Sequence, residues 1–237
     1  MNASLSVLPR TQILPDTPFQ FVTARPLLDE VLGEIGPLPR GALFLGQAED
    51  GLPVLLSLHD PTPGPVLILG EKGSGKTDLL RLITHFVIAT KTPGEVQFAV
   101  LTHRSEEWQE RLADAPHCVG VFNCHEPTSR QLLRSLELWV SRAGGQQQAV
   151  LLLIDGLEAV LAWDGSTMHS LRQILTHGPE RKVWPIATTR LAQDASLHEW
   201  ITLFRTRITA RDPSHRPGFS VTKQGRQINF WVPALGF

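Results

Sequence analysis

The 237-residue sequence has almost no net charge and no apolar run long enough to cross a membrane. Its 22 Lys and Arg residues and 23 Asp and Glu residues give a formal charge of −1, so no overall basic field attracts nucleic acid or an anionic membrane surface. The most apolar stretch, residues 149–163, is broken by Asp155 and Glu158. Residues 1–20 lack the basic and apolar segments of a signal peptide. These absences predict a soluble, cytoplasmic protein without a membrane partner.

Cysteine is scarce as well, and only Cys118 and Cys124 are present. Each has a histidine beside it, His117 or His125, so the four side chains resemble a zinc-ligand set. Structural zinc sites favour C-x₂₋₄-C spacing, whereas the residues between these two cysteines have the pattern of a strand. We interpret both cysteines as small apolar residues in or beside a core strand.

The strongest motif is a glycine-rich loop between a short apolar run and a helical pattern. Residues 70–77 match the phosphate-binding pattern G-x-x-x-x-G-K-[ST]. The glycines let backbone N–H groups face an anion, and the next helix presents its positive end to the same anion. Lys76 can reach the β- and γ-phosphates of a nucleotide, and the Thr77 hydroxyl can ligate Mg²⁺. A glycine turn without a ligand is the weaker alternative, because the flanking strand and helix are those that the motif requires. The candidate nucleotide-binding residues are Gly70, Glu71, Lys72, Gly73, Ser74, Gly75, Lys76, Thr77 and Asp78.

Strand and helix patterns alternate along most of the chain. The spacing predicts strands over residues 42–45, 53–58, 66–69, 96–102, 118–123, 149–155, 183–188, 203–210, 218–223 and 227–232. It predicts helices over residues 26–35, 78–88, 105–113, 127–143, 166–177 and 195–201. Strands separated by helices indicate an α/β fold with a mostly parallel, doubly wound sheet, here flanked by antiparallel strands. We expect residues 1–41 to be an irregular lead-in with a short helix, and residues 42–237 to be the main domain.

A phosphate loop needs an acid on a neighbouring strand to hold Mg²⁺. Residues 150–154 are uniformly apolar, and Asp155 follows them at the carboxyl end of the predicted strand. Ligands of open α/β sheets bind at that edge. Asp155 is therefore the candidate metal ligand beside Thr77, although a buried strand that ends in an Asp155-Gly156 turn has the same pattern.

Hydrolysis also needs a group that orients or deprotonates the attacking water. The residue after Asp155 is Gly156, so the nearest further carboxylate belongs to Glu158, at the start of a helical stretch. Glu158 either faces the site or is a solvated first-turn glutamate favoured by the helix dipole. The strand over residues 183–188 leads into Thr189, where a hydroxyl either contacts the γ-phosphate or simply ends the strand.

Residues 205–226 are locally basic. Three interpretations compete: a solvated face, an arginine finger that reaches the ATP of a neighbouring subunit, and a patch that contacts DNA phosphates. Arg205 and Arg207 alternate along one predicted strand, so both are expected to point from the same face.

Two other nucleotide-binding classes fit less well. The sequence lacks the Asn-Lys-x-Asp stretch by which GTPases select guanine. It also lacks a lid segment with clustered arginines, as a small-molecule kinase would have, between the second and fourth strands. An ATPase is therefore favoured over both.

The order of these motifs resembles the FtsK/HerA class of P-loop motor ATPases, especially the FtsK/SpoIIIE DNA-translocase domain. The phosphate loop matches, and residues 45–54 are similar to the hairpin that precedes the loop in that family. Residues 187–190 are similar to the family's Ala-Thr-Gln-Arg strand end, and residues 206–211 to its T-R-I-x-h-R strand. The last strands of the chain also resemble those of the family, so the resemblance covers residues 42–233. Residues 42–237 are therefore identified as an FtsK-like domain.

The resemblance implies a RecA-like core, ATP with Mg²⁺, a homo-oligomer such as a hexameric ring, and double-stranded DNA as the substrate. The sequence departs from the family at two places: Gly156 stands where the family has a glutamate, and Thr189 stands where it has a glutamine. By resemblance, Glu158 becomes a stand-in base, Thr189 the γ-phosphate sensor and Arg207 a candidate finger. These departures imply slow hydrolysis or a site completed by another subunit. An ATP-binding switch that engages a protein partner and a secretion-type ATPase stay open as alternatives.

Overall fold

The computed structural model describes residues 25–112, 114–142, 147–160, 163–190, 195–211, 218–223 and 225–236. Residues 1–24, most of the predicted lead-in, lie outside this part. The strands are β1 (Ala42–Ala48), β2 (Pro53–Ser57), β3 (Val66–Leu69), β4 (Val96–Thr102), β5 (Cys118–Asn123), β6 (Ala149–Asp155), β7 (Val183–Thr189), β8 (Thr206–Ala210), β9 (Gly218–Lys223) and β10 (Arg226–Trp231). The helices are α1 (Leu28–Ile35), α2 (Lys76–Thr90), α3 (Glu106–Leu112), α4 (Pro127–Ser141), α5 (Leu157–Val160), α6 (Gly165–His177) and α7 (Ala195–Leu203), with a 3₁₀ turn η1 (Pro179–Arg181).

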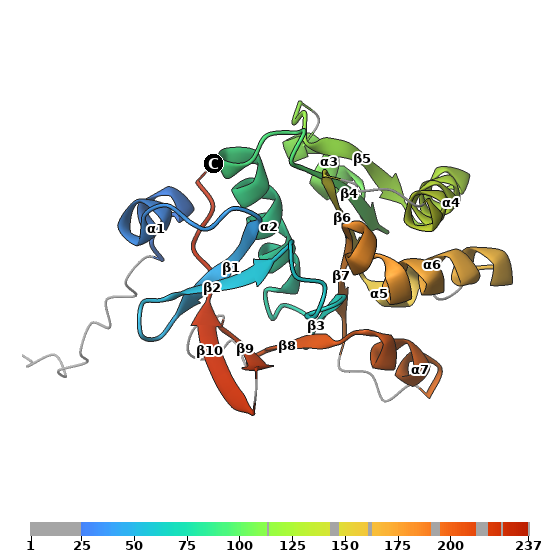
Figure 1. The fold of residues 1–237 in the computed structure, drawn as a ribbon. Helices are drawn as coiled ribbons and strands as arrows, with labels where there is room; N and C mark the ends of the chain where they lie inside the picture. The colour runs from blue at the N-terminus through green and yellow to red at the C-terminus, as the bar shows by residue number, and fades with distance from the viewer. Residues whose placement is uncertain are drawn as a thin grey trace, which may run out of the picture.

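One ten-stranded sheet organises the molecule, in the order β2-β1-β10-β9-β8-β3-β7-β6-β4-β5 (Figure 1). The six strands from β8 to β5 in this order pair in parallel. The four from β2 to β9 pair antiparallel with one another, and β9 joins β8 in the same way. The predicted α/β class, a parallel sheet with antiparallel flanks, is confirmed.

Two apolar cores lie on the two faces of the sheet. Adjacent residues of a strand point to opposite faces, so Ile68 joins the core under α2 whereas Leu67 joins the core under α4, α6 and α7. Figure 1 shows α2 on one side of the sheet and α4 to α7 on the other. Strand β6 is buried along its whole length, as a strand covered on both faces must be. Helix α1, from the lead-in, packs into the α2-side core through Leu28 and Val31.

The boundaries differ from the predicted ones where local packing decides them. Strand β1 runs on to Ala48 because its end pairs with β10 on one side while Gln47 still pairs with β2 on the other. The register of the β1–β2 pairing shifts between Phe44 and Gly46. Gly46 has φ of +151°, and an added Cβ there would lie 2.4 Å from the Trp231 carbonyl oxygen. Strand β8 begins three residues later than predicted because α7 continues to Leu203.

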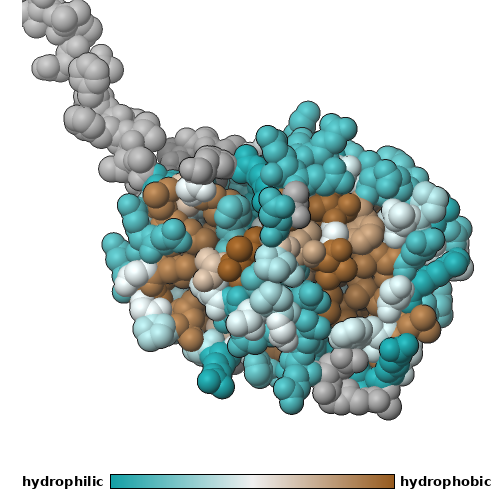
Figure 2. Space-filling view, turned by 90° about the horizontal axis from the view of Figure 1, so that it is seen from above, coloured by the Kyte–Doolittle hydropathy of each residue, from teal (hydrophilic) through white to brown (hydrophobic). Residues whose placement is uncertain are grey.

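The surface seen from above carries apolar areas set among hydrophilic ones (Figure 2). The large apolar side chains that are exposed within the described ranges are Leu27, Leu52, Val119 and Leu138. In that part of the chain, no helix is both long and apolar enough to cross a membrane.

Candidate nucleotide site at the phosphate loop

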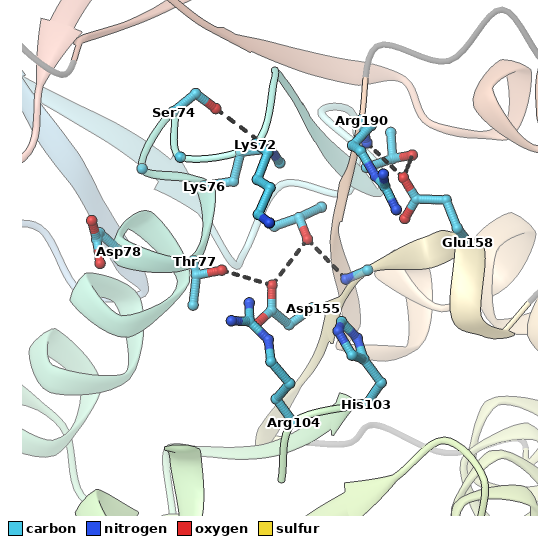
Figure 3. A pocket seen from close by; sticks show the side chains of 15 residues that line it. Lys72, Ser74, Lys76, Thr77, Asp78, His103, Arg104, Asp155, Glu158 and Arg190 are labelled. Atoms are coloured by element: carbon cyan, nitrogen blue, oxygen red, sulfur yellow. Dashed lines mark hydrogen bonds between the residues drawn. The ribbon is translucent and has the colours of Figure 1, made fainter. Parts of the chain in front are cut away.

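A pocket of about 600 Å³ opens at the carboxyl ends of the parallel strands (Figure 3). The strand ends meet there because Thr102 of β4 pairs with Asp155 of β6, which in turn pairs with Thr188 of β7. The pocket is lined by residues 72–78 and by His103, Arg104, Asp155, Gly156, Glu158, Thr188, Thr189 and Arg190. The structure therefore brings the predicted loop, metal and sensor residues into one site.

The phosphate loop takes its shape from three glycines. Gly73 and Gly75 have φ of +81° and +84°, a backbone conformation that L side chains rarely adopt. Gly70 is needed for close packing instead, because an added Cβ would lie 2.6 Å from the Ala210 Cβ. Gly70 and Glu71 form the base of the loop and do not line the pocket. Asp78 lines it, but its carboxylate turns away from the other labelled side chains and pairs with Arg81.

The Lys76 ammonium folds back onto its own loop. It donates to the carbonyl oxygens of Gly70 and Glu71, both at 2.7 Å, and contacts the Ser74 hydroxyl at 3.5 Å. Burial lowers the pKa of Lys76, and three nearby carboxylates oppose this effect. A phosphate in the pocket would offer this cation charged acceptors in place of neutral carbonyls.

Asp155 is the centre of a hydroxyl-rich cluster, and it is 5% exposed. Its Oδ1 accepts from the Thr77 hydroxyl at 3.0 Å and from the Thr188 hydroxyl at 3.2 Å. Its Oδ2 accepts from the indole N–H of Trp108 at 3.2 Å. A hydroxyl and a carboxylate oxygen within contact distance, with pocket space beside them, are the hard oxygen donors that Mg²⁺ takes. The donor set therefore fits the predicted metal.

Glu158 faces the site, which answers the question that the sequence left open. Its Oε1 accepts from the Thr189 hydroxyl at 2.8 Å and from the Arg190 backbone N–H at 2.6 Å. The flanking Leu157 and Val160 are fully buried and hold the short helix α5 against the core. Figure 3 shows the Glu158 carboxylate directed at Arg190 and the end of β7.

The backbone at Gly156 explains why the acid lies two residues further on. Gly156 has φ of +102°, and its N–H donates to the Thr188 hydroxyl at 2.9 Å. An added Cβ would meet ordinary contacts, 3.6 Å from Nδ1 of His103 and 3.9 Å from Oε2 of Glu158. Space is therefore available, but this backbone conformation disfavours any side chain at Gly156. The Glu158 carboxylate lies beside the position that a Cβ at residue 156 would take.

Gly156→Ala is expected to destabilise the protein by about 1–3 kcal/mol, because alanine would be held at a positive φ. Urea denaturation measures the loss. The matched control is Gly165→Ala at the start of α6, where an added Cβ meets nothing within 4 Å and no positive φ is required. A loss at Gly156 no larger than at Gly165 would contradict the backbone argument.

His103, Arg104 and Trp108 belong to the site but were not predicted from the sequence. His103 and Arg104 follow β4 directly and line the pocket. Ligands bind at the carboxyl ends of parallel strands, so the argument that predicts Asp155 also applies to these two residues. Arg104 is ion-paired with Glu107 at 2.9 Å. Trp108 belongs to no motif, and its contact with Asp155 depends on how α3 packs.

Arg207 does not line the nucleotide pocket of its own chain. Its guanidinium donates to the Ile201 carbonyl oxygen at 3.2 Å. Arg205 and Arg207 line a second concavity of about 510 Å³, so both arginines do point to one side as predicted. The other described residues that line it are Thr202, Phe204, Thr209, Ser220 and Thr222, and none of these has a carboxylate.

The two cysteines lie on opposite faces of the sheet. Cys118 packs against the α2-side core, and Cys124 belongs to the core on the other face. Burial raises the pKa of the Cys124 thiol to about 11, so this thiol stays protonated. His117 contacts the Lys91 carbonyl oxygen through Nε2 at 2.9 Å. These positions agree with the interpretation of the cysteines as small apolar residues.

Neither a scan against protein-family models nor a search of curated proteins found a match. Solved structures do match. The cytoplasmic domain of the type VII secretion ATPase EccC from Thermomonospora curvata has a TM-score of 0.67 at 16% identity, over 89% of this chain and 32% of that one. EssC (ATPases 2 and 3) from Geobacillus thermodenitrificans has a TM-score of 0.61 at 14% identity, over 90% of this chain and 47% of that one. The chain has the fold of the FtsK/HerA-class P-loop ATPases.

The P-loop ATPase fold also occurs in a smaller viral protein. The genome-packaging NTPase B204 from Sulfolobus turreted icosahedral virus 2, in complex with sulfate, has a TM-score of 0.51 at 11% identity, over 73% of this chain and 98% of that one. This chain spans only about a third to a half of the EccC and EssC structures. All these identities are low, so the likeness concerns the fold, and the activity must be argued from the pocket.

Proposed function

We propose that the chain binds Mg²⁺·ATP in the phosphate-loop pocket and hydrolyses it. The observation that carries the proposal is the 3.0 Å contact between the Thr77 hydroxyl and Oδ1 of Asp155, which joins the phosphate loop to the acid of β6 across 78 residues. Thr77 and Asp155 are the residues that would hold Mg²⁺, and the bound metal would neutralise charge on the β- and γ-phosphates. The loop N–H groups and the amino end of α2 would hold the phosphates.

Glu158 is proposed as the group that orients the attacking water. Within the described residues, both hydrogen bonds to Glu158 go to Oε1, from Thr189 and from the Arg190 backbone. Oε2 is therefore left to accept a proton from water on the side of Gly156. Thr189 is proposed as the γ-phosphate sensor. It ends β7, the strand beside the phosphate-loop strand, and its hydroxyl already contacts Glu158.

Arg207 is proposed to act on the ATP of a neighbouring subunit in a homo-oligomer, because it does not line its own pocket. Mixing Lys76→Ala subunits with Arg207→Ala subunits is then expected to restore turnover that neither variant has alone. In the mixture, a Lys76→Ala subunit supplies its arginine to an intact pocket. The rate of phosphate release by each variant and by the mixture is the measurement. If the mixture released phosphate no faster than the mean of the two variants, Arg207 would have no role in the pocket of a neighbouring subunit.

Double-stranded DNA is the proposed substrate, on the strength of the FtsK/SpoIIIE resemblance. Arg205 supports it locally, because the described residues that line its concavity include no carboxylate. A protein substrate is the second candidate. It is favoured by the likeness to secretion ATPases, one of which was solved with a signal sequence peptide.

ATP turnover with long duplex DNA, with an unfolded polypeptide and with neither separates the two candidates. Stimulation by DNA that weakens steeply as salt rises supports the DNA proposal, because phosphate contacts release counterions. Stimulation by polypeptide alone would replace DNA with a protein substrate.

A further inference from the structure

Trp108 of α3 contacts the acid at the centre of the pocket. Its indole N–H donates to Oδ2 of Asp155 at 3.2 Å, across 47 residues of sequence. Trp108 is 2% exposed, so solvent does not compete for this hydrogen bond. The bond links a helix outside the phosphate loop to the proposed metal ligand.

The two oxygens of the Asp155 carboxylate have different partners. Oδ1 accepts from the hydroxyls of Thr77 and Thr188, whereas Trp108 is the single donor to Oδ2 in the part of the chain that the structure describes. A carboxylate rotates in a broad torsional well, so a donor fixed on one oxygen sets the direction of the other. We propose that Trp108 is a positioning residue that holds Oδ1 of Asp155 toward Thr77 and so sets the affinity for Mg²⁺, an inference that rests on the proposed Mg²⁺·ATP function.

The indole is itself held in place from a second helix. The guanidinium of Arg81, on α2, lies 5.5 Å from the centre of the Trp108 ring. Arg81 also pairs with Glu107, the neighbour of Trp108, at 3.2 Å. Glu107 in turn pairs with Arg104, which lines the pocket. The donor is thus fixed by packing against α2 and by an ion-pair network, as a group that orients a metal ligand must be.

Trp108→Phe removes the N–H and keeps an aromatic ring in the core. Loss of a partner that orients a metal ligand typically lowers metal affinity by about 10–100-fold. We therefore expect the Mg²⁺ concentration at half-saturation of the nucleotide complex to rise by at least about tenfold. The affinity for ATP in EDTA is expected to stay within about twofold, because the phosphate loop is untouched.

Trp184→Phe is the matched control. Trp184, in β7, is fully buried in the same core as Trp108, but its indole N–H has no partner among the described residues. The same truncation there changes packing without removing a hydrogen bond. Its Mg²⁺ dependence is expected to equal that of the wild type.

The experiment titrates a fluorescent ATP analogue in EDTA and then in rising Mg²⁺, with wild type and both variants. A second measurement needs no variant: in ¹⁵N-labelled wild type with nucleotide bound, Mg²⁺ is expected to shift the Trp108 indole N–H resonance and leave that of Trp184 in place. A wild-type Mg²⁺ midpoint in folded Trp108→Phe, or an unmoved Trp108 resonance, would overturn the inference. Wild-type protein that binds no nucleotide in either condition would instead refute the proposed function, and this inference with it.

Discussion

Lys76→Ala is expected to weaken ATP binding by more than about a hundredfold and to abolish turnover. The ammonium donates two 2.7 Å hydrogen bonds at the base of the loop, and we propose that it exchanges them for phosphate oxygens. Hydrogen bonds that involve a charged group contribute about 1.5–3 kcal/mol each, so losing two costs about 3 kcal/mol or more. Since about 1.4 kcal/mol corresponds to a factor of ten, calorimetric titration with ATP measures the effect directly.

The control for this prediction is Lys91→Ala, at the carboxyl end of the same helix. Lys91 does not line the pocket, and its ammonium lies over the Phe86 ring, 5.5 Å from the centroid. Its removal is expected to leave the dissociation constant for ATP unchanged. Equal ATP affinity in Lys76→Ala and wild type would show that the phosphate loop is not the nucleotide site.

Glu158→Gln is expected to lower turnover by about 10²–10⁴-fold while ATP binding is retained. The amide oxygen of glutamine can still accept from Thr189 and from the Arg190 backbone, so the loop geometry is preserved. What is lost is the carboxylate that takes a proton from water. Single-turnover hydrolysis beside equilibrium binding separates the two effects.

Glu106→Gln, on α3 outside the pocket, is the control, because it removes an equal charge without touching the site. It is expected to hydrolyse ATP at the wild-type rate. If Glu158→Gln also kept that rate, Glu158 would have no part in water activation. Its contact with Thr189 would then be purely structural.

The phosphate loop and the acid of β6 could be predicted because both follow from local patterns. Residues 66–69 and the helix after them have the strand and helix spacing of the motif, and the structure places both elements within two residues of the predicted limits. Asp155 was found by its place at the carboxyl end of an apolar strand, a position that parallel topology brings into the site.

The orientation of Glu158 could not be predicted, since it depends on a backbone turn. Glycine at position 156 permits φ of +102° but does not require it. Only this turn, with α5 packed by Leu157 and Val160, directs Glu158 to the end of β7. The contact between Trp108 and Asp155 could not be predicted either. It depends on how α3 packs against α2, and no sequence spacing relates the two residues.

The measurement that tests the central claim most directly is steady-state ATP hydrolysis by the purified protein, with Mg²⁺ and with EDTA, beside Lys76→Ala and Glu158→Gln. The arrangement of Thr77, Asp155 and Glu158 predicts Mg²⁺-dependent turnover that both substitutions remove. Tight binding of Mg²⁺·ATP without turnover, alone or with DNA or polypeptide, would contradict a hydrolase. It would identify the chain as a nucleotide-dependent switch in which Glu158 only ties α5 to β7.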